Sequence, residues 1–255
     1  MDPLSIPKGI SINSILNLIQ QKEQLQIQHR LFVPIGGALQ QAIVSWSKIN
    51  GQNLVKEGLQ ANWNCMGPPM TQPPKEMVFL KSREELQAFN QILEEDFHQK
   101  IIIESDVTEL YNPVFLVLMS SGYCRCIISC KQQGWAITLD LQQAYSHVTV
   151  SKQLQKYLAF SHQGKTYTYL TMPFGISTAP RFFTKIMRLV LTVIRQKGIL
   201  TSSYLDDGIA WFQSQEKTIE GTIYIINLFQ ELELTINFRK SFLVPTQTPD
   251  YLGIH

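Results

Sequence analysis

Hydrophobic and polar positions alternate along the chain in two patterns, one with the spacing of helices and one with the spacing of strands. Apolar residues spaced three and four apart predict helices with one buried face. Segments with this spacing are 11–30, 37–48, 83–98, 180–195 and 218–232. Short apolar or alternating runs between turn residues predict strands. Such runs lie at 101–104, 112–119, 124–129, 135–140, 160–161 and 166–172, on both sides of the Asp206-Asp207 pair, and in a closing pair of short strands that reaches Tyr251.

Residues that favour turns and helix ends set several of these bounds. Segment 66–74 is rich in proline and predicts an extended linker. Ser82 and Glu85 have the spacing of a capping box, and Pro180 suits the first turn of a helix. Gly208 is expected to help the turn that holds the two aspartates. The mixed order of helices and strands indicates an α+β domain with an antiparallel sheet.

Composition narrows the class of protein only a little. The chain has 255 residues, 44% of them hydrophobic, which is enough for a sizeable core. A net charge of +2 allows a nucleic-acid partner without arguing for one. No signal-peptide core or run of membrane-spanning length is apparent. We therefore expect an intracellular protein, cytoplasmic or nuclear, with no membrane partner.

Three carboxylates are the main candidates for chemistry. Asp140 ends a predicted strand, and Asp206 and Asp207 lie at the tip of a predicted hairpin. Adjacent like charges repel, and each loses hydration if it is buried. If the strands are neighbours, the three acids converge and could bind Mg²⁺. Two ions about 3.5–4 Å apart could activate an attacking hydroxyl and neutralise a leaving pyrophosphate. The alternative is a solvated turn, which is the commoner setting for such a pair.

Five sequence blocks, in order, resemble the catalytic blocks of reverse transcriptases. The resemblance covers roughly residues 75–255. An upstream set, residues 36–39 with Trp46 and residues 58–59, is more like the lead-in of DIRS-type retrotransposon polymerases. The five blocks are LDLQQAYSHV at 139–148, MPFGISTAPRFF at 172–183, YLDD at 204–207, LTINFRKS at 234–241 and YLGI at 251–254.

The resemblance implies a fingers–palm polymerase fold, with an antiparallel palm sheet backed by helices. Residues 1–74 would form an N-terminal helical extension and linker, 75–134 a shortened fingers region, and 135–255 the palm. The implied reaction is template-directed DNA synthesis with two Mg²⁺ ions, or Mn²⁺ in their place. The implied partners are an RNA or DNA template with its primer, and deoxynucleoside triphosphates. An intron-type or telomerase-like polymerase is the alternative among enzymes.

The resemblance also assigns roles to single residues. Asp140, Asp206 and Asp207 would bind metal, together with the backbone carbonyl of Leu141. Tyr145 would lie under the incoming sugar and exclude a 2′-hydroxyl, although a core aromatic is the plainer interpretation. Gly175 would let the backbone approach the nucleotide or template closely, and a simple turn before the next helix is its alternative.

Three further groups receive roles in binding from the resemblance. Lys240 would sit near the leaving phosphate, unless it is simply solvated. Tyr251, Leu252 and Gly253 would hold the primer end. The stripe of Arg181, Lys185 and Arg188 could face a nucleic-acid backbone or be an ordinary solvated helix face.

The fingers region departs from the family pattern. Arg125 matches the arginine that contacts the triphosphate, but Met119 or Ser120 stands at the usual lysine. Roughly two dozen family residues are missing after Ser129, and the chain stops before a thumb. A catalytically inactive relic that binds nucleic acid or protein is therefore the competing hypothesis. The cysteines at 124, 126 and 130 lack the paired second half of a zinc site, so no structural zinc is expected.

Overall fold

The computed structural model describes residues 12–61, 83–105 and 134–252. Helices and strands alternate irregularly along this part of the chain. The helices are α1 (Ile12–Phe32), α2 (Ile43–Lys48), α3 (Gln52–Glu57), α4 (Arg83–His98), α5 (Lys152–Gln155), α6 (Ala179–Gln196) and α7 (Gln215–Glu231), with 3-10 turns η1 (Ala38–Ala42) and η2 (Ala144–His147). The strands are β1 (Ile102–Glu104), β2 (Trp135–Asp140), β3 (Ala159–His162), β4 (Lys165–Tyr169), β5 (Leu200–Tyr204), β6 (Asp207–Phe212) and β7 (Phe242–Thr246).

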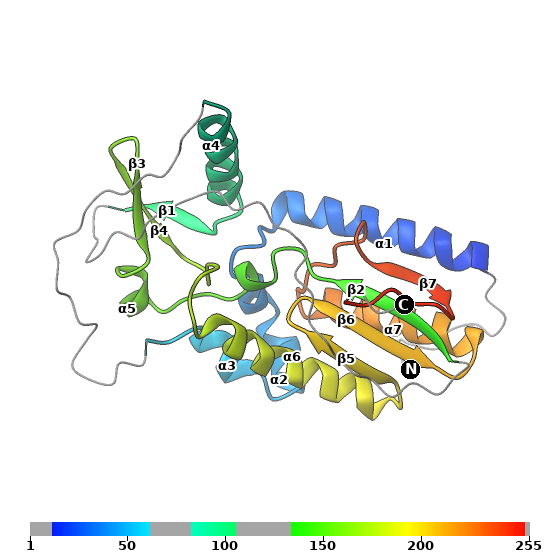
Figure 1. Cartoon of the computed structure of the whole chain (residues 1–255). Coiled ribbons are helices and arrows are strands. Elements are labelled where there is room, and N and C mark those ends of the chain that lie inside the picture. The colour runs from blue at the N-terminus through cyan, green and yellow to red at the C-terminus, as the bar shows by residue number, and fades with distance from the viewer. Residues whose placement is uncertain (1–11, 62–82, 106–133, 253–255) are drawn as a thin grey trace.

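The larger sheet is antiparallel and has the strand order β5-β6-β2-β7. Helices α6 and α7 pack on one of its faces (Figure 1). The N-terminal helix α1 runs along the β7 side and also contacts α7. This arrangement confirms the expected α+β class and the antiparallel sheet backed by helices.

The sequence explains why α6 and α7 cover the sheet. Pro180 lies in the first turn of α6, where its missing amide hydrogen costs nothing. The Ser214 hydroxyl caps α7 by accepting a hydrogen bond from the Lys217 amide at 3.3 Å. Both helices bury apolar side chains against the sheet, and these form most of the main core. From α6 they include Phe183, Ile186, Val190 and Ile194, and from α7 Ile225, Ile226 and Phe229.

A second, smaller sheet has the order β1-β4-β3 and is also antiparallel. Helix α4 packs beside β1, and Phe89, Ile102 and Phe160 form a separate small core there. The two sheets lie at opposite ends of the molecule (Figure 1). The chain between them includes a short antiparallel bridge that joins Thr149 and Thr171.

Most of the predicted elements are present, with a few differences. The helices at 11–30, 37–48, 83–98, 180–195 and 218–232 are confirmed, the second beginning as a 3-10 turn. The closing strand pair is only partly right, because β7 is followed by a single bridge position at Tyr251. Helices α3 and α5 were not predicted. The strands at 112–119 and 124–129, the proline-rich linker and Ser82 lie outside the described residues. No helix in the described part of the chain is long and apolar enough to cross a membrane.

Candidate active site

The β5–β6 hairpin presents the two neighbouring aspartates. Tyr204 pairs with Asp207, so only Leu205 and Asp206 form the turn. Leu205 adopts a positive φ of 55°, the left-handed conformation that such tight hairpin turns require. The expectation that Gly208 helps the turn was wrong. Gly208 lies inside β6, paired with Ser203 on one side and opposite Leu139 on the other.

Asp140 and Asp207 lie directly opposite each other at the end of the sheet. They are register partners of β2 and β6, and the Leu141 amide donates to the Asp206 carbonyl oxygen at 3.1 Å. The two carboxyl groups form a hydrogen bond to each other. Burial, then the negative charges of Asp206 and Asp140, raise the pKa of Asp207 to about 6. The carboxyl group of Asp207 therefore takes up a proton more readily than an ordinary aspartate does.

The segment after α7 encloses the backbone of Asp140. The Asn237 amide donates to the Asp140 carbonyl at 2.9 Å, and the Asp140 amide donates to the Ser241 hydroxyl at 2.9 Å. Burial raises the pKa of Asp140, while the positive charge of Lys240 opposes this shift. Lys240 also lowers the pKa of Asp207. The structure therefore brings Lys240 close to the acids, and its role at a leaving phosphate stays a prediction.

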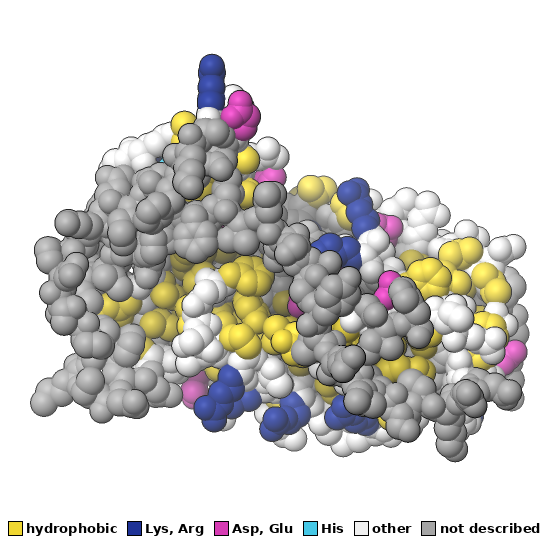
Figure 2. Space-filling model, in the orientation of Figure 1, with side chains coloured by type: hydrophobic (Ala, Val, Ile, Leu, Met, Phe, Trp, Pro, Cys, Tyr) yellow, Lys and Arg dark blue, Asp and Glu magenta, His cyan; other side chains and the backbone are white. Residues whose placement is uncertain are grey.

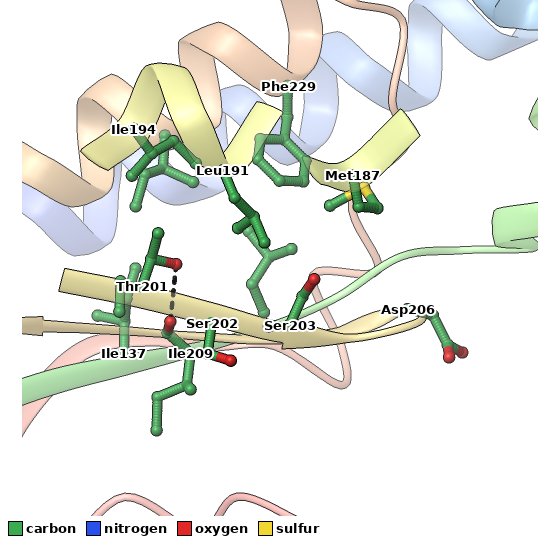
Figure 3. Close-up of a pocket in the computed structure, with 14 residues that line it drawn as sticks. Ile137, Met187, Leu191, Ile194, Thr201, Ser202, Ser203, Asp206, Ile209 and Phe229 are labelled. Carbon is green, nitrogen blue, oxygen red and sulfur yellow. Dashed lines mark hydrogen bonds between the residues drawn. The ribbon is translucent and has the colours of Figure 1, made fainter. Parts of the chain in front are cut away.

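Asp206 is near Asp140 and Asp207, but its side chain does not point toward them. Its charge raises the pKa of both Asp140 and Asp207, so it lies within electrostatic reach. Its side chain points outward from the tip of the hairpin (Figure 3). Among the described residues, no three His, Cys, Asp or Glu side chains are gathered as a ready-made metal site. The donor chemistry suits a hard divalent ion, with Asp140 and Asp207 in place and Asp206 adjacent.

Tyr145 lies in η2, close to the hairpin. Its ring is buried and lies 5.0 Å from the ring of Phe174 and 5.6 Å from that of Phe183, between centroids. Burial, then the charge of Asp206, raises the pKa of its phenol. Tyr145 is thus both a core aromatic and a neighbour of the carboxylates. The core-aromatic interpretation is confirmed, and the contact with an incoming sugar stays a prediction.

Gly175 has the backbone conformation that its position requires. Its φ is +94°, where a side chain is strained. Within the described part of the chain, and apart from its two sequence neighbours, no atom lies within 4 Å of the point where a β-carbon would be placed. The neighbouring Phe174 is 66% exposed. This stretch therefore leaves open space beside the site.

The expected primer-binding residues are only partly described. Tyr251 is buried, and its hydroxyl donates to the Asp207 carbonyl at 3.2 Å. Leu252 follows with a positive φ of 54°. Tyr251 therefore supports the hairpin from the side of the chain's last segment. Gly253, Arg125 and the three clustered cysteines lie outside the described residues.

A small cavity of about 20 Å³ lies behind the hairpin, between α6, α7 and the sheet (Figure 3). Ser202, Ser203, Met187 and Phe229 are among the side chains that line it. Its volume is enough for about one water molecule. The cavity is therefore a packing gap and has no room for a substrate.

Sequence reasoning missed several groups that hold the site together. Asn237 and Ser241 were inside a motif block but received no role, although their backbone and hydroxyl groups hold Asp140. Gln26 of α1 was not considered, although it is buried against Ile236. No local signal singled it out, because α1 has no clear apolar face and apolar side chains beside Gln26, Leu25 and Ile27, are exposed.

Comparison with known proteins decides the family. The family model described as reverse transcriptase (RNA-dependent DNA polymerase) matches residues 77–255. The chain belongs to the reverse transcriptase family. The match includes every element that carries the acids, and it begins after α1, α2 and α3. Together with the transposon relatives described next, this match supports the predicted retrotransposon origin.

Relatives of this reverse transcriptase domain include transposon polyproteins of Schizosaccharomyces pombe. The Tf2-3 polyprotein is 29% identical over 127 residues, which are 49% of this chain and 9% of that protein. The Tf2-7 polyprotein is 28% identical over the same length. The domain therefore spans a small part of the polyproteins that it matches.

Solved structures with the same fold include a foamy viral protease-reverse transcriptase. One, described in complex with ds DNA, has a TM-score of 0.60 and 19% identity, covering 74% of this chain and 36% of that one. Another, in complex with an RNA/DNA hybrid, has a TM-score of 0.56 and 15% identity over 95% of this chain and 35% of that one. At these identities the likeness establishes the fold, and it confirms the reverse transcriptase fold expected from the sequence.

Proposed function

We propose that this domain catalyses template-directed DNA synthesis, in which a primer 3′-hydroxyl attacks the α-phosphate of a deoxynucleoside triphosphate. The observation that carries the proposal is the pairing of Asp140 with Asp207 at one end of the sheet, with Asp206 in the adjoining turn. An adjacent cation, Lys240, completes a site suited to phosphate chemistry. Membership of the family supports the same reaction.

The carboxylates of Asp140, Asp207 and Asp206 would hold divalent ions, Mg²⁺ in the first instance. Bound ions would supply charge neutralisation for the phosphates and lower the pKa of the attacking hydroxyl. A bound ion would favour the ionised form of Asp207, whose pKa is otherwise raised to about 6. Asp206 would turn inward toward the ion, which its position in a two-residue turn allows.

Other residues of the chain would bind and orient the reactants. Tyr145, buried next to Asp206, would form the floor under the sugar and leave no room for a 2′-hydroxyl. Gly175 and the exposed Phe174 border the open space where a nucleotide or template base would lie. Lys240 would face the leaving pyrophosphate as a positive charge. Tyr251 and Leu252 would hold the primer end next to the hairpin.

The distribution of charge along the sequence between Asp140 and Asp206 supports a nucleic-acid partner. No Asp or Glu occurs between Asp140 and Asp206. The positive side chains in that interval are Lys152, Lys156, Lys165, Arg181, Lys185, Arg188, Arg195 and Lys197. Such an imbalance attracts a phosphate backbone. The matching foamy viral structures are complexes with DNA or an RNA/DNA hybrid, as their descriptions state.

Primer extension on an RNA template with Mg²⁺ tests this proposal. We expect extension by the wild type, and a loss of roughly a hundredfold or more in Asp140→Asn, Asp206→Asn and Asp207→Asn, because a missing metal ligand removes several kcal/mol of transition-state stabilisation. Glu220→Gln is the matched control, since it neutralises an exposed acid on α7. Failure of the folded wild type to extend a primer that it binds would support the inactive binding domain instead.

A further inference from the structure

Helix α1 lies outside the segment that matches the family, yet it packs beside the candidate active site. It ends at Phe32, whereas the family match begins at residue 77. Ile15 is fully buried against Ile219 and Ile223 of α7. Further along, α1 reaches the segment that follows α7. In Figure 1 it runs along the β7 side of the sheet.

The backbone of Ile236 presents two polar groups to this helix. Ile236 and Leu141 form an antiparallel bridge. The hydrogen bonds of that bridge lie on either side of the pair, from the Asn237 amide to Asp140 at 2.9 Å and from the Gln142 amide to Thr235 at 3.0 Å. In such a pair the amide and carbonyl of the central residue point away from the partner strand. Ile236 therefore needs other partners on its outer side.

The side-chain amide of Gln26 supplies both partners. Its Nε2 donates to the Ile236 carbonyl at 2.8 Å, and its Oε1 accepts from the Ile236 amide at 3.0 Å. Gln26 is only 9% exposed. The side chain thus replaces a neighbouring strand at this edge of the sheet. Without it, two buried backbone groups would lose their hydrogen bonds, which is costly.

A second contact ties the end of α1 to the start of the same segment. One Arg30 nitrogen, Nη2, donates to the Glu233 carbonyl at 3.1 Å and lies 3.0 Å from the Glu233 carboxylate. The ring of His29 lies 2.9 Å from that carboxylate. The helix therefore holds the segment at Glu233 and again at Ile236. Directly after Ile236, the same segment holds the backbone of Asp140 through Asn237 and Ser241.

We propose that Gln26 is a positioning residue for the metal-binding carboxylates, and that α1 is an integral support of the active site. This inference rests on the proposed function. By fixing Ile236, Gln26 keeps the Asn237 amide on the Asp140 carbonyl and keeps Lys240 next to the acids. The support acts on the geometry of the acids, so it affects metal binding and the chemical step more than template binding.

Amide hydrogen exchange, Mn²⁺ binding and steady-state kinetics test the inference in the full chain. In Gln26→Leu we expect exchange at the Ile236 and Asn237 amides to rise about tenfold or more, the size expected for one or two lost hydrogen bonds. We also expect Mn²⁺ binding to weaken several-fold and kcat to fall about tenfold, with KM for the template-primer near that of the wild type. Gln26→Glu keeps the acceptor for the Ile236 amide and loses the donor to the Ile236 carbonyl, so exchange at the Ile236 amide should rise less than in Gln26→Leu. It also serves if Gln26→Leu does not fold.

Two variants separate positioning from general stability. Gln28→Leu makes the same chemical change on the exposed side of α1 and should leave all three measurements unchanged. Ile15→Ala weakens the packing of α1 on α7 away from Gln26, so it should lower the melting temperature without the rise in exchange at Ile236. The inference is overturned if Gln26→Leu leaves exchange at Ile236 and Asn237 unchanged. It is also overturned if Ile15→Ala alters exchange and kcat as strongly.

The experiment distinguishes this inference from the proposed function. A wild type that neither binds Mn²⁺ nor extends primers would contradict the proposed function. In that case, exchange at Ile236 and Asn237 still decides whether Gln26 supports the segment that holds Asp140. Normal exchange with a lowered kcat in Gln26→Leu would contradict the inference alone.

Discussion

At the residue scale, His147 shows how a buried polar side chain can be fully satisfied. It is completely buried next to the candidate site. Its Nε2 accepts a hydrogen bond from the Thr235 amide at 2.9 Å, so the proton lies on Nδ1 and is donated to the Ala144 carbonyl at 3.1 Å. Burial, helped by the positive charge of Arg30, lowers the pKa of His147 to about 4. The ring is therefore neutral at physiological pH.

The free energy of unfolding should depend on pH because of His147. Its pKa is about 4 in the folded chain and 6.5 as the ordinary value, so the unfolded chain binds the proton more tightly between those limits. The neutral ring therefore contributes fully to the free energy of unfolding above pH 6.5. This contribution, roughly 3 kcal/mol, is lost as the pH falls toward 4. Urea unfolding followed at pH 7 and pH 5 should show about 2 kcal/mol of this loss, because the folded-state pKa lies below pH 5.

The variant His147→Gln isolates that contribution from others. Asp96 and Asp207 have pKa values raised to about 6, so they stabilise the fold as the pH falls through 6 and partly mask the histidine. The two proteins share these carboxyls, so the difference between their pH profiles reports His147. Parallel profiles for wild type and variant would show that the ring is not held neutral by burial.

At the element scale, the short helices α2 and α3 pack on the main core around the side chain of Trp46. Trp46 of α2 is fully buried, and its indole Nε1 donates to the Leu232 carbonyl at 3.0 Å. Gly51, in the turn that follows α2, packs against the same ring, and Val55 of α3 belongs to the main core. These helices therefore contact the chain immediately before the segment that holds Asp140.

Replacing Trp46 by Phe should destabilise the fold by about 2 kcal/mol. The smaller ring leaves a gap and leaves the Leu232 carbonyl without its indole donor. The free energy of unfolding from urea titration measures the change. Val44→Ala is the control. The Val44 side chain lies on the same helix and is 70% exposed, so its loss should change the free energy of unfolding by less than about 0.5 kcal/mol. Equal losses in both variants would contradict the docking role of Trp46.

At the scale of the whole molecule, positive charge gathers along the outer side of α6. Arg181, Lys185 and Arg188 are exposed on the side opposite the one that packs on the sheet. They form no ion pair with any residue of the described ranges. Figure 2 shows Lys and Arg side chains along the margin of the molecule where α6 lies in Figure 1. This surface is open to a long nucleic acid.

Neutralising this stripe should reduce the salt dependence of nucleic-acid binding. In the triple variant Arg181→Gln, Lys185→Gln, Arg188→Gln, we expect the slope of log affinity against log salt concentration to fall by about two to three, since each lost phosphate contact removes roughly 0.9. Fluorescence anisotropy with an RNA/DNA hybrid across salt concentrations measures the slope. Lys217→Gln on α7 is the control. A slope unchanged in the triple variant would identify the stripe as an ordinary solvated helix face.

Much of the fold could be predicted because its local patterns are strong. The apolar spacing in 180–195 and the proline at its start determine α6, and the apolar run that ends at Asp140 determines β2. The order of the motif blocks indicated the family. Local signals sufficed here because helix periodicity and strand burial depend mainly on near neighbours in the sequence.

The turn at the hairpin and the support of Asp140 depended on tertiary structure instead. Leu205 rather than Gly208 takes the positive φ, because strand register determines which residues occupy the turn. Gln26 and Ile236 meet across 210 positions of sequence, so no local pattern can pair them. The sequence alone thus determined most of the elements and the family, and it predicted which acids form the site. Only the tertiary structure decided which backbone groups and side chains hold those acids in place, since buried hydrogen bonds between distant segments form only when the chain is folded.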